Sequence, residues 1–405
     1  MQPERPHLEV ADLVRLHGKG LSPGLSTAQQ NVLRHIATCR TAALGGHVDQ
    51  CDGCGHERPS YNSCRDRHCP KCQGPQRAAW VKQRLARLLP VPYFHVVFTL
   101  PEELNRVLLR NKRRGYAMLF AAAAQTLQQI AADPDRLGAE IAITAVLHTW
   151  GQDLRFHPHL HCVVTGGGLA PDGTRWIAGR ERYFLPVRVL SKLFRGKFLA
   201  ALNDAYEKVQ LDLGGQCADL TDANAWAAMR DQLYRKNWVV YAKPPFGGPE
   251  VVFRYLGRYT HRVAISNQRL VSLVDGQVTF TVKDYADGNR IKTMTLGAEQ
   301  FLRRFLLHVL PCRFVRIRHY GLVAGRSVDS KLAAARQLLA ANASGCQRTV
   351  APSPETLPAS TVAGLNVCPA CGKPLMRRCG MVPNAGLKYT SNLARASPTA
   401  SVVAP

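Results

Sequence analysis

The stretch RFHPHLHCVVTGGG, residues 155–168, decides the fold of this chain. Its β-branched residues favour a strand, and alternate side chains of a strand point to the same face of a sheet. His159 and His161 therefore point one way, while Leu160 and Cys162 point the other way. The pattern predicts a strand with one apolar face for a core and one face of imidazoles.

Two imidazoles side by side on a sheet can share one divalent metal ion and leave positions open for a substrate oxygen. The alternative is a surface strand that happens to be rich in histidine, but three histidines at alternate positions favour a metal site. A third ligand is needed, and the candidates are His148, in the preceding predicted strand, His157 and Gln152. The sequence does not choose among them.

The patterns around this strand predict an α+β fold, with an antiparallel sheet flanked by helices. Further strands are expected at 93–100 and 139–150, a hairpin at 277–296, and helices at 104–132, 190–210, 299–310 and 331–342. We expect three parts. They are a helical and zinc-ribbon domain at 1–90, a catalytic domain at 91–340, and a linker, small cysteine module and tail at 341–405.

The composition favours a polyanionic partner. The 405 residues are 46% hydrophobic, carry a formal net charge of +25 and have a pI near 9.9. Such an excess of positive charge favours nucleic acid over other partners. No uncharged apolar run approaches the ~20 residues of a membrane span. We therefore expect a cytoplasmic, nucleoid-associated protein, in which thirteen cysteines are more consistent with metal ligands than with disulfides.

Nine of the thirteen cysteines lie in two regions of the chain, six between Cys39 and Cys72 and three near the C-terminus. Cys51, Cys54, Cys69 and Cys72 form two Cys-x2-Cys turns, which together predict a structural zinc site of four thiolates. Further residues nearby could complete a second site: Cys39, His47, Cys64 and His68. Near the C-terminus a small zinc knuckle with an unassigned fourth ligand is possible at Cys368, Cys371 and Cys379. Around the first set, Arg65, Arg67 and Lys71 suit phosphate contacts.

A second motif, RYLGRYTHRV at 254–263, places two tyrosines four residues apart. In the helix that the pattern favours, Tyr255 and Tyr259 lie on one face. Such pairs are usually packed in a core, yet this pair is surrounded by Arg254, Arg258 and Arg262. Tyrosine can attack a phosphodiester as a covalent nucleophile, and neighbouring guanidinium groups favour the phenolate. Two nucleophiles would allow two successive strand transfers.

The order of these motifs resembles a known family. His159-Leu160-His161 is similar to the His-hydrophobic-His motif of HUH endonucleases, and Tyr255-x3-Tyr259 is similar to the paired tyrosines of their two-tyrosine branch. The cysteine ribbon, histidine strand and tyrosine helix follow one another as in rolling-circle transposases of the insertion-sequence-ninety-one family. The resemblance runs from about residue 39 to about residue 320.

This resemblance implies an HUH-type sheet and a nickase and strand transferase for single-stranded DNA at the ends of a mobile element. It also implies 5'-phosphotyrosine intermediates and Mg²⁺ or Mn²⁺ as the catalytic ion, beside structural Zn²⁺. Two alternatives remain. A plasmid relaxase or rolling-circle replication initiator would share the chemistry, and a non-catalytic zinc-containing DNA-binding regulator would explain the charge and the cysteines alone.

Overall fold

The computed structural model describes residues 8–21, 24–179, 185–243, 257, 264–284, 287–343, 367–373 and 376–384. The chain divides into two compact units. The first is formed by Met1–Ala37 and Arg65–Pro352, and the second by Thr38–Cys64 and Ser353–Pro405. These units divide the chain at different residues from the three ranges expected from the sequence. In particular, the C-terminal segment joins the N-terminal cysteine region in one unit.

The first unit is built on a five-stranded antiparallel sheet, as the alternating patterns predict. Its order is β12-β4-β5-β3-β8, so the histidine strand β5 is central. The bounds are β12 (Ile317–Gly321), β4 (Ala142–Trp150), β5 (Phe156–Thr165), β3 (Tyr93–Thr99) and β8 (Val240–Lys243). The fold class is therefore confirmed as mixed helix and antiparallel sheet.

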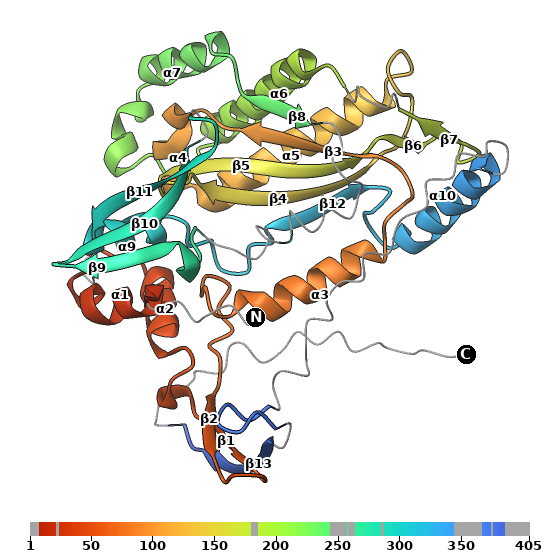
Figure 1. Cartoon of the computed structure of the whole chain (residues 1–405). Helices are drawn as coiled ribbons and strands as arrows, with labels where there is room; N and C mark the ends of the chain where they lie inside the picture. The colour runs from red at the N-terminus through yellow and green to blue at the C-terminus, as the bar shows by residue number, and fades with distance from the viewer. Residues whose placement is uncertain are drawn as a thin grey trace, which may run out of the picture. The chain divides into compact units, whose positions relative to one another are not determined.

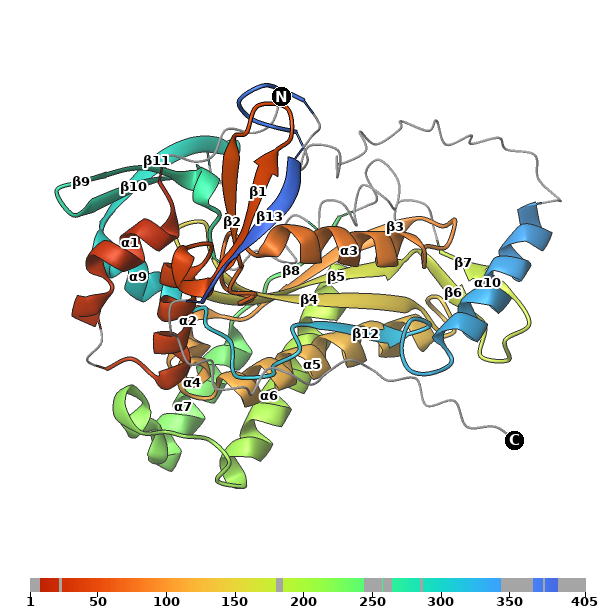
Figure 2. The ribbon, with the colours of Figure 1, turned by 90° about the horizontal axis from the view of Figure 1, so that it is seen from below.

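One face of this sheet is covered by helices (Figures 1 and 2). They are α4 (Asn105–Arg110), α5 (Lys112–Ala132), α6 (Val187–Glu207) and α7 (Ala223–Arg235). The even-numbered residues of β5 and β3 enter this core, among them Leu160, Cys162 and Phe98, which are all fully buried. Phe98 packs on Phe194 of α6 with ring centroids 4.9 Å apart. This apolar layer fixes which face of β5 is left for the histidines.

A smaller apolar cluster lies on the opposite face of the sheet. Helices α3 (Gln73–Leu85) and α10 (Val328–Ala343) and the short ribbon of β6 (Gly167–Leu169) and β7 (Trp176–Ala178) contribute to it. Figure 2 shows α3 on the opposite side of the sheet from α5. The triple glycine ends at Gly168, where a Cβ atom would lie 2.3 Å from the carbonyl oxygen of Glu140. Backbone thus approaches this glycine too closely for any other side chain to fit.

A second antiparallel sheet in the same unit has the order β11-β10-β9. Its strands are β9 (Leu270–Val274), β10 (Gln277–Asp284) and β11 (Arg290–Gly297), and helices α9 (Ala298–Leu306), α1 (Val10–His17) and α2 (Thr27–Thr38) accompany them. Phe280 packs edge-on against Phe301 of α9. Ser26 and Gln29 exchange the two hydrogen bonds of a capping box at the start of α2. Five 3-10 turns complete the described elements: Lys19–Leu21, Ala42–Leu44, Glu102–Leu104, Gly215–Thr221 and Asn267–Arg269.

The second unit contains a three-stranded antiparallel sheet of order β13-β1-β2. Strand β1 (Gly46–Cys51) pairs with β2 (Glu57–Tyr61) on one side and with β13 (Met376–Val382) on the other. The sequence indicated a ribbon here but not the third strand, because β13 is more than 300 residues away. Within the described part of the chain, no helix has the length and apolarity to cross a membrane.

Candidate active site

The strand register brings three histidines together on the face of the sheet opposite α5. His148 of β4 lies directly across from His159 of β5, and His161 lies diagonally across from His148. Ligand nitrogens of His148, His159 and His161 all lie within 4.8 Å of one another. The His148 and His161 ring centroids are 4.3 Å apart. Among the residues that the structure describes, no carboxylate joins this group.

Hydrogen bonds set which ring nitrogen each histidine of β5 can offer. Nδ1 of His159 donates to the carbonyl oxygen of His157 at 2.7 Å, so a neutral His159 keeps its lone pair on Nε2. Nδ1 of His161 is joined by a 2.8 Å hydrogen bond to Nε2 of His95 on β3. When His161 is the donor in that bond, its Nε2 is likewise left for a metal. In that tautomer of His161, both side chains present the same type of ligand atom.

Burial keeps the site uncharged at neutral pH. Desolvation lowers the pKa of His159 to about 4, and desolvation together with the neighbouring histidines lowers the pKa of His161 well below its usual range. Burial and the nearby Lys243 lower the pKa of His95 to about 4. Metal ions bind the neutral imidazole, so His159 and His161 are in the form that coordination requires.

Trp150 contacts the histidine cluster, and His308 in turn contacts Trp150. Trp150 stacks on His148, with centroids 4.7 Å apart and an interplanar angle of 23°. His308 follows α9 and is fully buried. Its Nε2 donates a hydrogen bond to the carbonyl oxygen of Leu154, and its Nδ1 forms a hydrogen bond with the hydroxyl group of Thr149. Burial lowers the pKa of His308 to about 3. His308 therefore anchors the connection between β4 and β5 and is not a ligand.

The structure separates the candidates for the third ligand. His148 joins His159 and His161, whereas His157 and Gln152 lie outside the group. His157 contributes its carbonyl oxygen to His159, and the carbonyl oxygen of Gln152 accepts a hydrogen bond from Arg269. Tyr255, Tyr259, Arg254, Arg258 and Arg262 lie outside the described residues.

Sequence reasoning missed His95. It is a single histidine in the apolar strand YFHVVFT, and only the pairing of β3 with β5 brings it beside His161. The two rings are nearly parallel, 12° apart, with centroids separated by 5.0 Å. A polar side chain that is 93% buried in an apolar strand indicates a functional role. That burial becomes known only when the fold is known.

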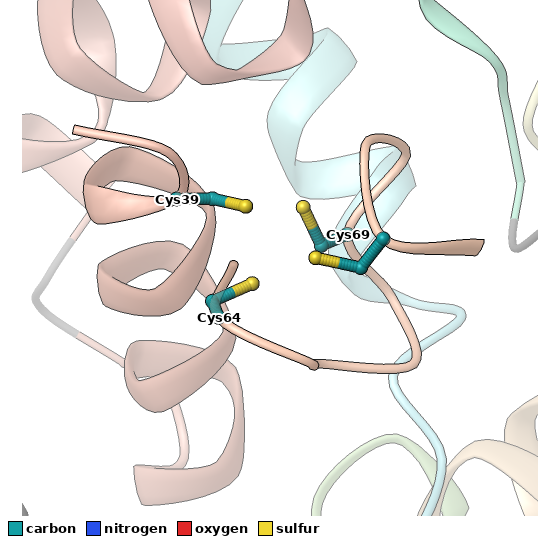
Figure 3. Close-up of side chains that lie close together, drawn as sticks. Cys39, Cys64 and Cys69 are labelled. Carbon is teal, nitrogen blue, oxygen red and sulfur yellow. The ribbon is translucent and has the colours of Figure 1, made fainter. Parts of the chain in front are cut away.

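The sulfur atoms of Cys39, Cys64, Cys69 and Cys72 form one cluster. All four lie within 4.8 Å of one another and all four side chains are buried. Figure 3 shows Cys39, Cys64 and Cys69 pointing toward a common centre. Four thiolates in this arrangement suit a tetrahedral zinc ion, which leaves no open position for catalysis.

This grouping corrects the zinc set predicted from the sequence. Cys51 and Cys54 do not join Cys69 and Cys72, but lie with Cys368 and Cys371 in a second cluster. The spacing of a Cys-x2-Cys motif predicts the local turn. It does not indicate which second turn supplies the other two ligands of the site. Three further predicted ligands belong to neither cluster. His47 lies 3.5 Å from the Asp49 carboxylate, and His68 forms hydrogen bonds with Asp66 and the Leu310 amide. Sγ of Cys379 lies 3.4 Å from the Val48 carbonyl oxygen.

The basic residues predicted to contact phosphate differ in their surroundings. Arg67 donates to the carbonyl oxygen of Phe314 at 2.6 Å, and Lys71 pairs with Glu9. Arg65 is exposed. Contact of these three residues with DNA stays a prediction, and the side chains of Arg65 and Arg67 are both exposed.

Comparison with known proteins places the chain in a family. Residues 142–331 match the family described as "Putative transposase", and residues 15–100 match the family described as "Transposase zinc-binding domain". A putative transposase, y4qJ, of Sinorhizobium fredii is 53% identical over 368 residues, which is 90% of this chain and 92% of that protein. The chain belongs to the insertion-sequence-ninety-one family of transposases.

A more distant relative of this transposase is the transposase for insertion sequence element IS801 of Pseudomonas savastanoi pv. phaseolicola. The two are 28% identical over 313 residues, 75% of this chain and 72% of the relative. No solved structure matches the chain. A transposase cleaves DNA and transfers strands. A polyanionic DNA substrate therefore accounts for the large positive charge of the chain.

Proposed function

We propose that this transposase cleaves and joins single-stranded DNA at the ends of a mobile element, with Tyr255 and Tyr259 as nucleophiles and a divalent cation on His148, His159 and His161. The observation that carries the proposal is the convergence of these three imidazoles on one face of the central strands. A purely DNA-binding regulator would give this histidine cluster no role. The matches to transposases favour transposition over plasmid mobilisation or replication initiation.

The donor set narrows the choice of cation. Three imidazole nitrogens suit Mn²⁺ and the softer divalent ions better than Mg²⁺, which prefers oxygen ligands. We therefore favour Mn²⁺ of the two ions that the family resemblance implies. A cation bound there supplies electrostatic stabilisation of the negative charge that develops on the oxygens of the scissile phosphate. The carbonyl oxygen of His157 fixes the tautomer of His159, and the hydrogen bond to His95 orients the imidazole of His161.

The proposed covalent step uses one tyrosine at a time. The phenol oxygen loses its proton and forms a bond to phosphorus, while the bond between phosphorus and the 3'-oxygen breaks. The 3'-oxygen takes a proton from solvent, which leaves a 3'-hydroxyl and a 5'-phosphotyrosine. Attack of a second DNA hydroxyl on that phosphotyrosine reverses the step and joins strands without ATP. The second tyrosine supports a second transfer of the same kind.

A covalent adduct is the decisive product. Labelled single-stranded DNA that carries an element end, incubated with the protein and Mn²⁺, is expected to give a band of protein-linked DNA on a denaturing gel. Proteolysis and mass spectrometry should place the link within residues 254–263. Heat-denatured protein and double-stranded DNA of the same sequence are the controls. If the link maps to a serine or to another region of the chain, the proposed nucleophiles are wrong.

His95 is expected to tune the affinity of the site rather than its maximal rate. His95→Ala removes the hydrogen bond that orients His161, so we expect about 10- to 100-fold weaker Mn²⁺ binding, the usual effect of such a partner. Cleavage at saturating Mn²⁺ should stay close to that of the native protein. Titration of Mn²⁺ by electron paramagnetic resonance measures the affinity without any DNA.

His319 offers a matched control for this variant. It lies on the same face of the sheet, on β12, where its ring bonds to Thr144 and Arg84 and not to the clustered histidines. His319→Ala should leave the Mn²⁺ affinity unchanged, and His95→Gln, which keeps an acceptor, should restore part of the loss. Equal affinities for His95→Ala and the native protein would show that His95 is only a packing residue.

A further inference from the structure

The described residues of the second unit have almost no hydrophobic core. Among these described residues the buried positions are two glycines and four cysteines: Gly45, Gly46, Cys39, Cys51, Cys64 and Cys368. No aliphatic or aromatic side chain in the described part of this unit is buried to the same degree. A fold this small cannot be held by apolar burial alone and requires a cross-link or a metal ion.

Two turns of this unit have the same sequence pattern and the same backbone hydrogen bonds. One is CDGCG at 51–55 and the other is CPACG at 368–372. In each turn the glycine amide donates to the carbonyl oxygen of the first cysteine, at 2.8 Å for Gly55 and 2.9 Å for Gly372. Both glycines have φ near +71°, a left-handed conformation that favours glycine. Each turn is therefore shaped to present two thiols on one side, as zinc knuckles do.

The two turns face each other. Sγ of Cys51 lies 3.6 Å from Sγ of Cys371, and Sγ of Cys54 lies 3.6 Å from Sγ of Cys368. All four sulfur atoms fall within 4.8 Å of one another. The separation is too long for a disulfide bond and close to the edge of a tetrahedron of thiolates around zinc. Pairing of β1 with β13 brings the turns together from positions 314 and 320 residues apart in the chain.

We propose that Cys51, Cys54, Cys368 and Cys371 bind one structural zinc ion, which closes a single ribbon from the two ends of the chain. The zinc-binding family matches residues 15–100 and so includes only half of these ligands. This site is distinct from the Cys39, Cys64, Cys69 and Cys72 cluster and does not depend on the proposed tyrosine chemistry. Because the ligand turns flank residues 65–352 in sequence, the ribbon is completed only when the C-terminal segment has been made.

Cobalt substitution tests the proposal on the full chain. Co²⁺ bound to thiolates absorbs through sulfur-to-metal charge transfer, and the histidine centre contributes nothing to that band. We expect the native protein to show the intensity of two four-thiolate sites. Cys368→Ser with Cys371→Ser should lose about half of it, and Cys51→Ser with Cys54→Ser should lose the same half. Zinc measured by mass spectrometry should fall by one ion per chain in both variants.

Two further variants separate ligation from general damage. Cys379→Ser alters a cysteine of β13 outside the cluster and should keep the full charge-transfer band. Cys371→His keeps a zinc ligand at the position and should retain the zinc ion, with a weaker charge-transfer band. The proposal is overturned if the Cys368→Ser, Cys371→Ser protein keeps the native band, or if the native protein shows the intensity of only one site.

Discussion

His161→Ala is expected to reduce DNA cleavage at least about 10³-fold, which corresponds to a loss of about 4 kcal/mol of transition-state stabilisation. His161 lies at the centre of the cluster, since its ring is within 5 Å of the rings of His148, His159 and His95. Its removal leaves two imidazoles of the three and takes away the hydrogen-bond partner of His95. Single-turnover cleavage of labelled single-stranded DNA at a series of Mn²⁺ concentrations measures the loss. Excess Mn²⁺ should recover only a small part of it.

Leu160→Ala, which changes the preceding residue of β5, serves as the control because it should reduce stability and leave cleavage intact. It is fully buried in the helix-covered core, so Leu160→Ala should lower the free energy of unfolding by about 2–5 kcal/mol. Below its unfolding transition this variant should still bind Mn²⁺ and cleave DNA. His161→Ala should unfold close to the native denaturant midpoint. Loss of cleavage through unfolding in His161→Ala would remove the support for a metal-binding role.

Replacement of both Tyr255 and Tyr259 by phenylalanine is expected to abolish the covalent adduct. Phenylalanine keeps the ring and removes only the nucleophilic oxygen, so no bond to phosphorus can form. Single-stranded DNA binding should persist, because electrostatic attraction to the basic chain does not need the hydroxyl groups. The adduct is measured on a denaturing gel, and binding is measured by fluorescence anisotropy of a labelled oligonucleotide.

Tyr241→Phe is the matched control for the double variant. Tyr241 is an exposed tyrosine of the edge strand β8 and lies outside the histidine cluster. We expect it to form the adduct as the native protein does. The single variants Tyr255→Phe and Tyr259→Phe then show whether one tyrosine suffices for the first cleavage. An adduct of native yield in the double variant would contradict the assignment of the nucleophiles.

Local features of this chain could be predicted because they depend on neighbouring residues. The alternation of His159, Leu160 and His161 predicts a strand with one polar face, and the structure confirms this arrangement. The two Cys-x2-Cys turns at 51–54 and 69–72 follow from short spacings in the same way. Periodicity and turn chemistry act over a few residues, so a sequence displays them directly.

Pairing of distant segments could not be predicted in this way. Cys51 and Cys54 have the same spacing as Cys69 and Cys72, and nothing in that spacing shows that Cys368 and Cys371 are their partners. The sequence left His148, His157 and Gln152 as equal candidates for the third ligand, and it gave no role to His95. The register of β4 and β3 against β5 separates them, since it places His148 and His95 beside His161.

The sequence by itself determined the kinds of chemistry available to this transposase: imidazoles on one face of a strand, thiols in tight turns, paired tyrosines and a large positive charge. Only the tertiary structure decided which of these groups meet. The reason is that ligand sets are made by contacts between strands far apart in the chain. Those contacts are fixed by the burial of apolar faces and by backbone pairing rather than by the ligands themselves.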